Sequence, residues 1–286
     1  MASQAPHGPA APPPAYQHPP VAEVAIGVYF QPLTGLKSVH IGGLAKVWAK
    51  RFPQVDDQPP LPPVPVEAPL STPMVLPPFQ IQFGGQLPSP RVVFQSSAGE
   101  RQLQIQRDRI VCNWRLVADT DPYPHYHVLR EEFAQIFREF GAFASRNNVG
   151  LAKPLQTEVT YINPVPLNSL GERADLSSLL VPWSGERADD FLPEAEETRV
   201  AVRFPIKVQD AWRGSLYVNA LPASSVSAAD QRTLILLQVF ARTRVTSDGA
   251  EAVMEAMDLG HDWAVRGFAS LTELRVQTEI WRRSDA

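Results

Sequence analysis

Residues 100–116 read ERQLQIQRDRIVCNWRL, and this stretch decides the fold that we expect for the rest of the chain. Apolar and polar residues alternate along it, which is the period of a half-buried β-strand. The alternation is interrupted at Arg107 and Asp108, as expected for a hairpin with a two-residue turn. That turn would bring four apolar side chains onto one face of the two strands. They are Leu103, Ile105, Ile110 and Cys112.

The other face of the hairpin is polar, and it is the first surface on which we expect a partner to bind. Antiparallel sheets commonly leave one face to solvent, so an ordinary solvated surface is the alternative interpretation. Later strands add Arg242 and Arg244 to this polar set, and a third strand adds Arg199 and Arg203. The candidate binding residues are Gln102, Gln104, Gln106, Arg107, Arg109, Asn113, Arg242 and Arg244.

Two long helices are expected to cover the apolar face of the sheet. The clearer one runs from residue 123 to about residue 147, and its apolar side chains recur every three or four positions. They are Leu129, Phe133, Ile136, Phe137, Phe140 and Phe143. The second is predicted from about residue 249 to residue 281, with an interruption near Gly267 or Leu271, and a shorter helix is predicted over residues 36–52.

Strands and helices follow one another in a way that favours an α+β fold. Further strands are indicated at 21–33, 79–83, 91–95, 155–162, 199–208, 214–221 and 234–245. Runs of antiparallel strands between helices predict one or two curved sheets with the long helices packed on one face. The order strand, helix, strands, long helix occurs twice, the second time with a degenerate first helix. We therefore expect two pseudo-repeated halves, residues 21–150 and 151–286.

The 29 prolines are roughly double the usual share of about 5%. Residues 1–20 are rich in proline and alanine without periodicity, so we expect a disordered tail. Residues 53–78 are also dense in proline, which excludes a regular helix and disfavours a central strand. Because this segment carries apolar residues such as Val64, Val66 and Leu70, which can pack on a surface, we interpret it as an extended polyproline-like strap that belongs to the first half, and not as a free linker.

The composition is that of a soluble globular protein, with 44% hydrophobic and 20% charged residues. The net charge is −4 and neither half is strongly basic, which counts against nonspecific nucleic-acid binding. Cys112 is the single cysteine, so an intrachain disulfide and a thiolate metal cluster are excluded. No signal-peptide pattern is found, and no apolar run approaches the roughly 20 residues that span a bilayer. We expect a cytoplasmic protein without membrane contact.

No pattern predicts catalysis, a metal site or a cofactor. His125 and His127 are two residues apart at a helix start, where their side chains diverge, so surface positions are favoured. Cys112 is predicted to be a small buried hydrophobic residue rather than a nucleophile. His261 lies on or beside the apolar stripe of the last helix, where a hydrogen-bonded histidine facing the sheet is favoured over a base. The acidic pairs Asp56-Asp57 and Asp189-Asp190 are predicted in loops, where solvated carboxylates are favoured over a functional site. The glycine pairs Gly42-Gly43, within the helix predicted over residues 36–52, and Gly84-Gly85 lack the sequence context of a phosphate-binding loop.

Several short motifs, taken in order, resemble a sporadically distributed bacterial family of uncharacterised proteins of about this length. They are Phe52 to Asp57, Leu103 to Trp114, Tyr123-Pro124 with the phenylalanine helix, Glu158 to Asn163, and His261 with Phe268. The resemblance covers roughly residues 21–283, and the family usually carries a glutamate near Asp56-Asp57. The family has no established activity, so it assigns no catalytic residue here. Its patchy distribution suggests a link to mobile, defence or toxin–antitoxin genes.

These observations support three hypotheses about function. The leading hypothesis is a non-enzymatic binding or regulatory protein that binds a protein partner through the polar sheet face. The second is a small-molecule pocket between the sheet and the last helix, as in helix-grip folds, with His261 facing it. The third is nucleic-acid binding across a saddle made by the two halves, through Arg107, Arg109, Arg242 and Arg244.

Overall fold

The computed structural model describes residues 12–70, 91–118, 122–171, 174–183, 189, 191–193, 195–224 and 233–284. Within these residues, nine strands form one antiparallel sheet in the order β3-β4-β5-β6-β2-β7-β10-β9-β8. Their bounds are β2 Glu23–Phe30, β3 Gln54–Gln58, β4 Arg91–Gln95, β5 Arg101–Gln106, β6 Arg109–Arg115, β7 Pro154–Pro166, β8 Val200–Val208, β9 Ala211–Ser224 and β10 Thr233–Arg244. The two halves thus share one sheet, joined where β2 pairs with β7.

The hairpin of residues 100–116 has the register that the sequence predicts. Ile105 lies opposite Ile110, and Leu103 lies opposite Cys112, with the turn at residues 107–108. Leu103, Ile105 and Ile110 are fully buried. The prediction that this face forms the floor of the first core is confirmed.

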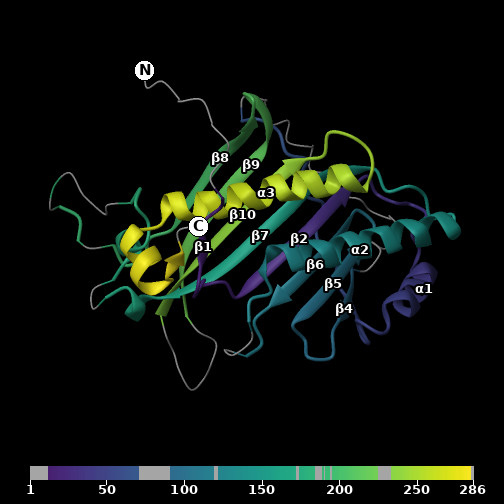
Figure 1. The fold of residues 1–286 in the computed structure, drawn as a ribbon, viewed down its shortest axis with the longest axis horizontal. Helices are drawn as coiled ribbons and strands as arrows, with labels where there is room; N and C mark the ends of the chain where they lie inside the picture. Colours follow the sequence, from purple (N-terminus) through teal and green to yellow (C-terminus); the bar gives the residue numbers. More distant parts are fainter. Residues whose placement is uncertain are drawn as a thin grey trace.

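Both long helices cover the same face of the sheet (Figure 1). They are α2, His125–Arg146, and α3, Ala250–Leu271, while the shorter α1, Ser38–Trp48, lies beyond α2 at one end. The phenylalanine stripe of α2 is buried, with Phe133 and Phe140 completely so. The last helix was predicted to reach residue 281, but α3 ends at Leu271, one of the two positions at which an interruption was expected, and a five-residue π-helix, Val276–Ile280, follows it. The α+β class and the antiparallel sheet are therefore confirmed.

Part of the segment expected to be a disordered tail has a defined structure. Ala15–Tyr16 forms a short strand, β1, which pairs with β11, Arg283–Ser284. The Tyr16 ring packs edge-on against Phe268 at 5.8 Å and against Trp281 at 6.1 Å. Strand pairing with β11 and the packing of Tyr16 together hold this proline-rich segment against the C-terminal part of the chain, which composition alone could not show.

The proline-rich segment also differs in part from the expectation. Residues 54–58 form β3, an edge strand paired with β4, and four of its five residues are exposed. Residues 59–70 form no regular structure and lie on the sheet face opposite α2 and α3. We call residues 59–70 the strap from here on. Residues 71–78 and the strand expected at 79–83 lie outside the described residues.

Across the described ranges, the helices are all too short or too polar to cross a membrane.

Candidate ligand pocket and polar sheet face

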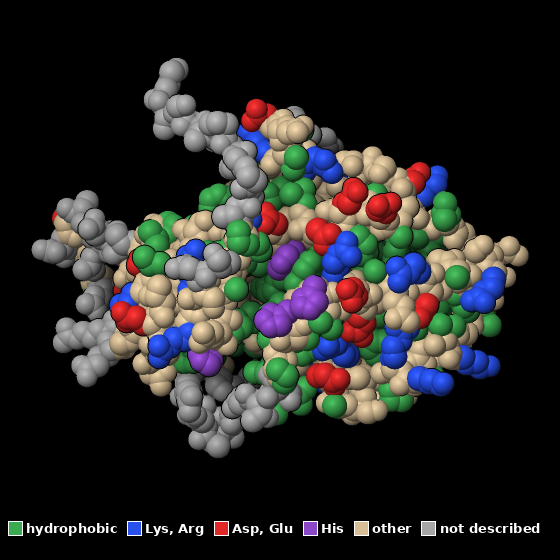
Figure 2. Space-filling model, in the orientation of Figure 1, with side chains coloured by type: hydrophobic (Ala, Val, Ile, Leu, Met, Phe, Trp, Pro, Cys, Tyr) green, Lys and Arg blue, Asp and Glu red, His purple; other side chains and the backbone are tan. Residues whose placement is uncertain are grey.

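A cavity of about 310 Å³ lies on the helix-covered face of the sheet. It is bounded by α3, the beginning of α2, strands β7 and β10, and the N-terminal segment around Tyr16. Figure 2 shows histidine side chains beside this hollow, which is lined by hydrophobic side chains. Ligand pockets typically measure about 300–1,000 Å³, so the cavity is at the small end of that range.

The walls of the cavity are mostly apolar, and the described lining residues include no Lys, Arg, Asp or Glu. The aliphatic and aromatic part is made by Tyr16, Val21, Val239, Ala264, Val265 and Phe268. Four prolines of the N-terminal segment complete the wall, Pro13, Pro14, Pro19 and Pro20. None of the lining residues is Lys, Arg, Asp or Glu. The cavity therefore offers an ionic ligand no counter-charge in its own wall.

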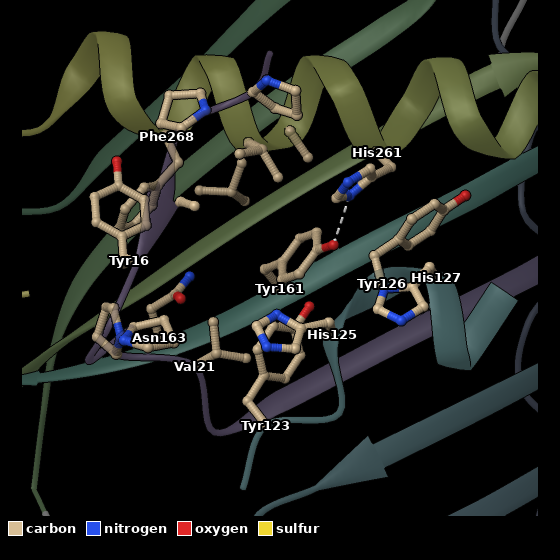
Figure 3. A pocket seen from close by; sticks show the side chains of 18 residues that line it. Tyr16, Val21, Tyr123, His125, Tyr126, His127, Tyr161, Asn163, His261 and Phe268 are labelled. Carbon is tan, nitrogen blue, oxygen red and sulfur yellow. Dashed lines mark hydrogen bonds between the residues drawn. The ribbon is translucent and has the colours of Figure 1, made fainter. Parts of the chain in front are cut away.

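One hydrogen-bonded pair, Tyr161 and His261, brings polar atoms to this apolar wall. Tyr161 faces α3 because alternate residues of β7 point to opposite faces of the sheet. Its hydroxyl lies 2.8 Å from Nδ1 of His261, and Figure 3 shows the two groups pointing toward each other. The tautomer of the imidazole decides which of the two donates the hydrogen bond. Asn163, buried on the same strand, donates from Nδ2 to the carbonyl of Leu237 at 3.0 Å.

A second set of contacts ties α2 to α3 beside the pocket. The ring of Tyr126 stacks on His261 with 3.7 Å between ring centroids and 8° between planes. The Tyr126 hydroxyl donates to Asp258 at 2.8 Å, and Arg130 donates to both oxygens of the same carboxylate at 2.6 and 2.8 Å. Residues 258 and 261 are three apart on α3, and 126 and 130 are four apart on α2, so each pair shares a helix face. This arrangement fixes the His261 ring in the pocket wall.

Burial controls the protonation of these groups. Burial lowers the pKa of His261 to about 4, although Asp262 and Asp258 act in the opposite direction. Burial also raises the pKa of Tyr161 well above its usual value and that of Tyr123 to about 12. At neutral pH His261 is therefore a neutral imidazole, and Tyr161 and Tyr123 are protonated phenols. Each can donate or accept a hydrogen bond with an uncharged polar group.

The remaining chemical candidates have placements close to those expected. His125 and His127 are exposed at the rim of the pocket, as expected. Their rings nevertheless stack 6.2 Å apart with 13° between planes and do not diverge, because His125 has a φ of 59° and so lacks helical geometry. Among the described residues, no group of three or more His, Cys, Asp or Glu side chains is arranged to hold a metal ion. Cys112 packs against the core, and burial raises its pKa well above the usual value. Cys112 is only partly exposed to solvent rather than fully buried as predicted, and a thiol with a raised pKa is a poor nucleophile.

The glutamine and asparagine candidates lie on the sheet face away from the pocket, because their strand positions alternate with the buried ones. Gln104 accepts from Arg91 at 2.8 Å and donates to Asn113 at 3.0 Å. Asn113 donates in turn to Glu23 at 2.7 Å. Gln102 is half-buried directly opposite Asn113 in the hairpin. These side chains form a network on the polar face, and His261 is separated from them by the sheet.

Several of the other candidates contact the strap. Gln106 bonds both the N–H and the carbonyl of Leu61, at 3.0 and 2.9 Å. Arg109 donates to the carbonyl of Pro62 at 2.7 Å and also pairs with Asp108. Arg107 lies elsewhere and donates to the carbonyl of Leu36 at 3.1 Å. The polar face therefore already holds an extended segment of this chain.

The strap is anchored by Glu67, which is only 6% exposed. Its carboxylate accepts from the Tyr217 hydroxyl at 2.7 Å and from Arg203 at 2.9 Å, and Arg242 lies 3.7 Å away. Arg242 pairs with Glu158 as well. Arg244 donates to the Glu67 carbonyl at 3.3 Å. We call Arg203, Tyr217 and Arg242 the carboxylate notch.

Sequence reasoning did not single out Tyr16, Tyr126, Tyr161, Glu67 or Tyr217. Tyr161 sits in a strand with buried alternate positions, so its burial was predictable although its pairing with His261 was not. Tyr217 lies on the polar side of β9, where an aromatic residue between polar neighbours is a usable signal for a binding face. A lone glutamate among prolines gives no such signal.

No protein-family model matches the chain, and no curated protein has a similar sequence.

Proposed function

We propose that this protein binds an uncharged, mostly apolar small molecule in the pocket between α3 and the sheet. The observation that carries the proposal is a cavity of about 310 Å³ whose apolar wall holds the hydrogen-bonded pair Tyr161 and His261. A long helix packed over an antiparallel sheet with a cavity between them is the arrangement that the sequence suggested for a helix-grip-like pocket.

The composition of the cavity wall favours an uncharged ligand, because the described lining residues include no Lys, Arg, Asp or Glu. A carboxylate or an ammonium group would lose its hydration on entering and would find no ionic partner there, which costs several kcal/mol or more. His261 does not provide one at neutral pH, because burial holds its pKa at about 4. An uncharged ligand avoids this cost, and one hydroxyl or carbonyl group suffices to bond Tyr161 or His261.

Matched aromatic probes test the proposal. We expect 2-naphthol to bind the full chain, and we expect 2-naphthoate and 2-naphthylmethylammonium to bind at least tenfold more weakly at neutral pH. Isothermal titration calorimetry measures all three. The naphthalene ring is common to the series, so differences in affinity report the substituent, which is uncharged only in 2-naphthol. Saturable binding of the neutral probe must also disappear when the cavity is filled.

Ala264→Leu fills the cavity, because Ala264 is 1% exposed and lines it from α3. Ala250→Leu is the matched control, an exposed position on the same helix. Loss of binding in the first variant and retention in the second support the proposal. Equal binding in both variants, or no binding of any probe to the wild-type chain, contradicts it.

A second candidate function is the one that the sequence favoured, binding of a protein partner through the polar sheet face. The observation that favours it is the strap, which shows that side chains of this face can hold an extended polypeptide. Capture of one defined partner by the wild-type chain, lost when polar-face residues are substituted, tests it.

Nucleic-acid binding stays a prediction with weaker support. Arg109 and Arg242 already pair with carboxylates, and Arg107 bonds a main-chain carbonyl. Binding of a phosphate backbone would have to compete with these contacts. An affinity measurement with duplex and single-stranded DNA at low salt tests the idea.

We further propose that the two halves arose by duplication and that the sheet is curved. Two facts support a duplication: β2 pairs with β6 as β7 pairs with β10, and a long helix follows β6 and β10 in turn. The family resemblance, the link to defence or toxin–antitoxin genes and the cytoplasmic location stay predictions.

A further inference from the structure

The strap is held on the sheet in the way that a bound peptide is held on a receptor. It spans residues 59–70 without regular secondary structure, and Glu67 is the one buried residue within it. Its hydrophobic side chains face solvent to a large extent, with Leu61, Val66 and Leu70 exposed by 39, 41 and 78%. Burial of apolar surface therefore contributes little to holding it.

Side chains of the sheet bond the main chain of the strap along its length. Gln106 and Arg109 bond its first half, as described above. Gln156 then accepts from the N–H of Glu67 at 2.7 Å and donates to the carbonyl of Pro65 at 3.1 Å. Arg203 donates to the carbonyl of Ala68 at 2.6 Å. Contacts of this kind recognise an extended backbone and tolerate different side chains, and a proline-rich chain is already extended.

The carboxylate notch supplies selectivity at one position. The Tyr217 ring lies beneath both guanidinium groups, at 5.4 Å from that of Arg203 and 5.7 Å from that of Arg242. It also stacks on Phe240 with 4.6 Å between centroids and 6° between planes. Arg203 is further fixed by Ser215 at 2.9 Å. The notch is therefore set by contacts within the sheet, and Glu67 only occupies it.

We propose that this face is a receptor for an acidic, proline-containing extended segment of a partner protein, and that the strap occupies it in cis until the partner displaces it. The partner's segment places a carboxylate between Arg203, Arg242 and Tyr217, as Glu67 does now. This inference specifies the second candidate function and is independent of the pocket. A tethered segment has an effective concentration near the millimolar range, so displacement requires a partner with comparable or better contacts.

A peptide of residues 59–70, PPLPPVPVEAPL, serves as the probe. The receptor is the full chain carrying Glu67→Ala, which removes the anchor of the strap and keeps the notch. We expect a fluorescently labelled peptide to bind this variant at least tenfold more tightly than the wild-type chain. A second peptide with glutamine at the position of Glu67 should bind at least tenfold more weakly. Fluorescence anisotropy measures both affinities, and thermal unfolding verifies that the variant is folded.

The outcomes separate the inference from the function on which it rests. Equal affinity for the two peptides overturns the carboxylate chemistry and leaves a peptide-binding face. No binding by a folded Glu67→Ala chain overturns the receptor altogether. A concentration-dependent dimer of that variant shows that a second copy of this chain is the occupant and overturns a separate partner.

A measurement on the wild-type chain covers the case in which Glu67→Ala does not fold. The amide of Glu67 is hydrogen-bonded to Gln156, so it should exchange slowly with deuterium. Added unlabelled peptide should accelerate its exchange in proportion to displacement of the strap, and the glutamine peptide should not. Exchange that is unchanged at millimolar peptide contradicts the proposal.

Discussion

His261 should make the folded protein lose stability as the pH falls from 6.5 toward 4. Its pKa is about 4 in the folded chain, and an unfolded histidine titrates near the ordinary value of 6.5. Because the folded value is the lower one, the unfolded chain binds the additional proton in this window. The contribution of neutral His261 to the free energy of unfolding is complete above the unfolded pKa of 6.5, and it is lost as the pH falls from 6.5 toward 4.

The size of the effect follows from the two pKa values. At about pH 5 the unfolded histidine is mostly protonated, and the folded one is mostly neutral. The pKa of the unfolded histidine, 6.5, lies about 1.5 units above this pH. At 1.36 kcal/mol for each unit, protonation of the unfolded chain lowers the free energy of unfolding by roughly 2 kcal/mol. Burial lowers the pKa of His261, and the carboxylates of Asp262 and Asp258 act against it. Tyr161, at 2.8 Å from Nδ1, and the stacked Tyr126 also face the ring.

Urea unfolding of the wild-type chain and of His261→Gln at about pH 7 and about pH 5 measures this contribution. Glutamine does not titrate, so the variant reports the pH dependence of every other group. We expect the wild-type chain to lose about 2 kcal/mol more than the variant between these two conditions. If the two proteins lose the same amount, the imidazole is protonated in the folded state and the pocket is not the water-poor site described here.

Two further predictions concern the core. Phe140→Ala should lower the free energy of unfolding by about 3–5 kcal/mol, because Phe140 is completely buried under α2 and stacks on Phe30 at 6.1 Å. Leu151→Ala, at a position 80% exposed, is the control and should change it by no more than about 0.5 kcal/mol in denaturant unfolding. The Cys112 thiol should react with a maleimide much more slowly in native buffer than in urea, since burial raises its pKa. Rapid native labelling followed by mass spectrometry would contradict its placement against the core.

The hairpin and the long helices were predictable because their signals are local. In residues 100–116 the alternation places alternate side chains on one face, and a two-residue turn leaves only one register. The phenylalanines of α2 recur at the spacing of one helix face. The edge strand β3 was not predicted because its sequence, QVDDQ, is mostly exposed. It therefore lacks the alternation of apolar and polar residues that would have indicated a strand paired with β4.

The pocket could not be predicted to the same extent, because a cavity is defined by residues that are distant in sequence. His261 was singled out correctly as a polar residue on an apolar stripe. Its partner Tyr161 lies 100 positions earlier, and Tyr16 closes the wall from a segment whose composition indicated disorder. Whether such residues enclose a space or fill it depends on side-chain packing across three elements.

Strand β7 is where the two candidate sites come closest, and its geometry explains how one strand serves both. Its residues alternate between the faces, so Gln156 contacts the strap and Glu158 pairs with Arg242 of the carboxylate notch, while Tyr161 and Asn163 line the pocket. The strand is paired along its length with β2 on one side and β10 on the other. A change on one face must therefore move a strand held by two neighbours before it reaches the other. We therefore expect ligand binding in the pocket and peptide binding on the polar face, both of them proposals, to be energetically independent.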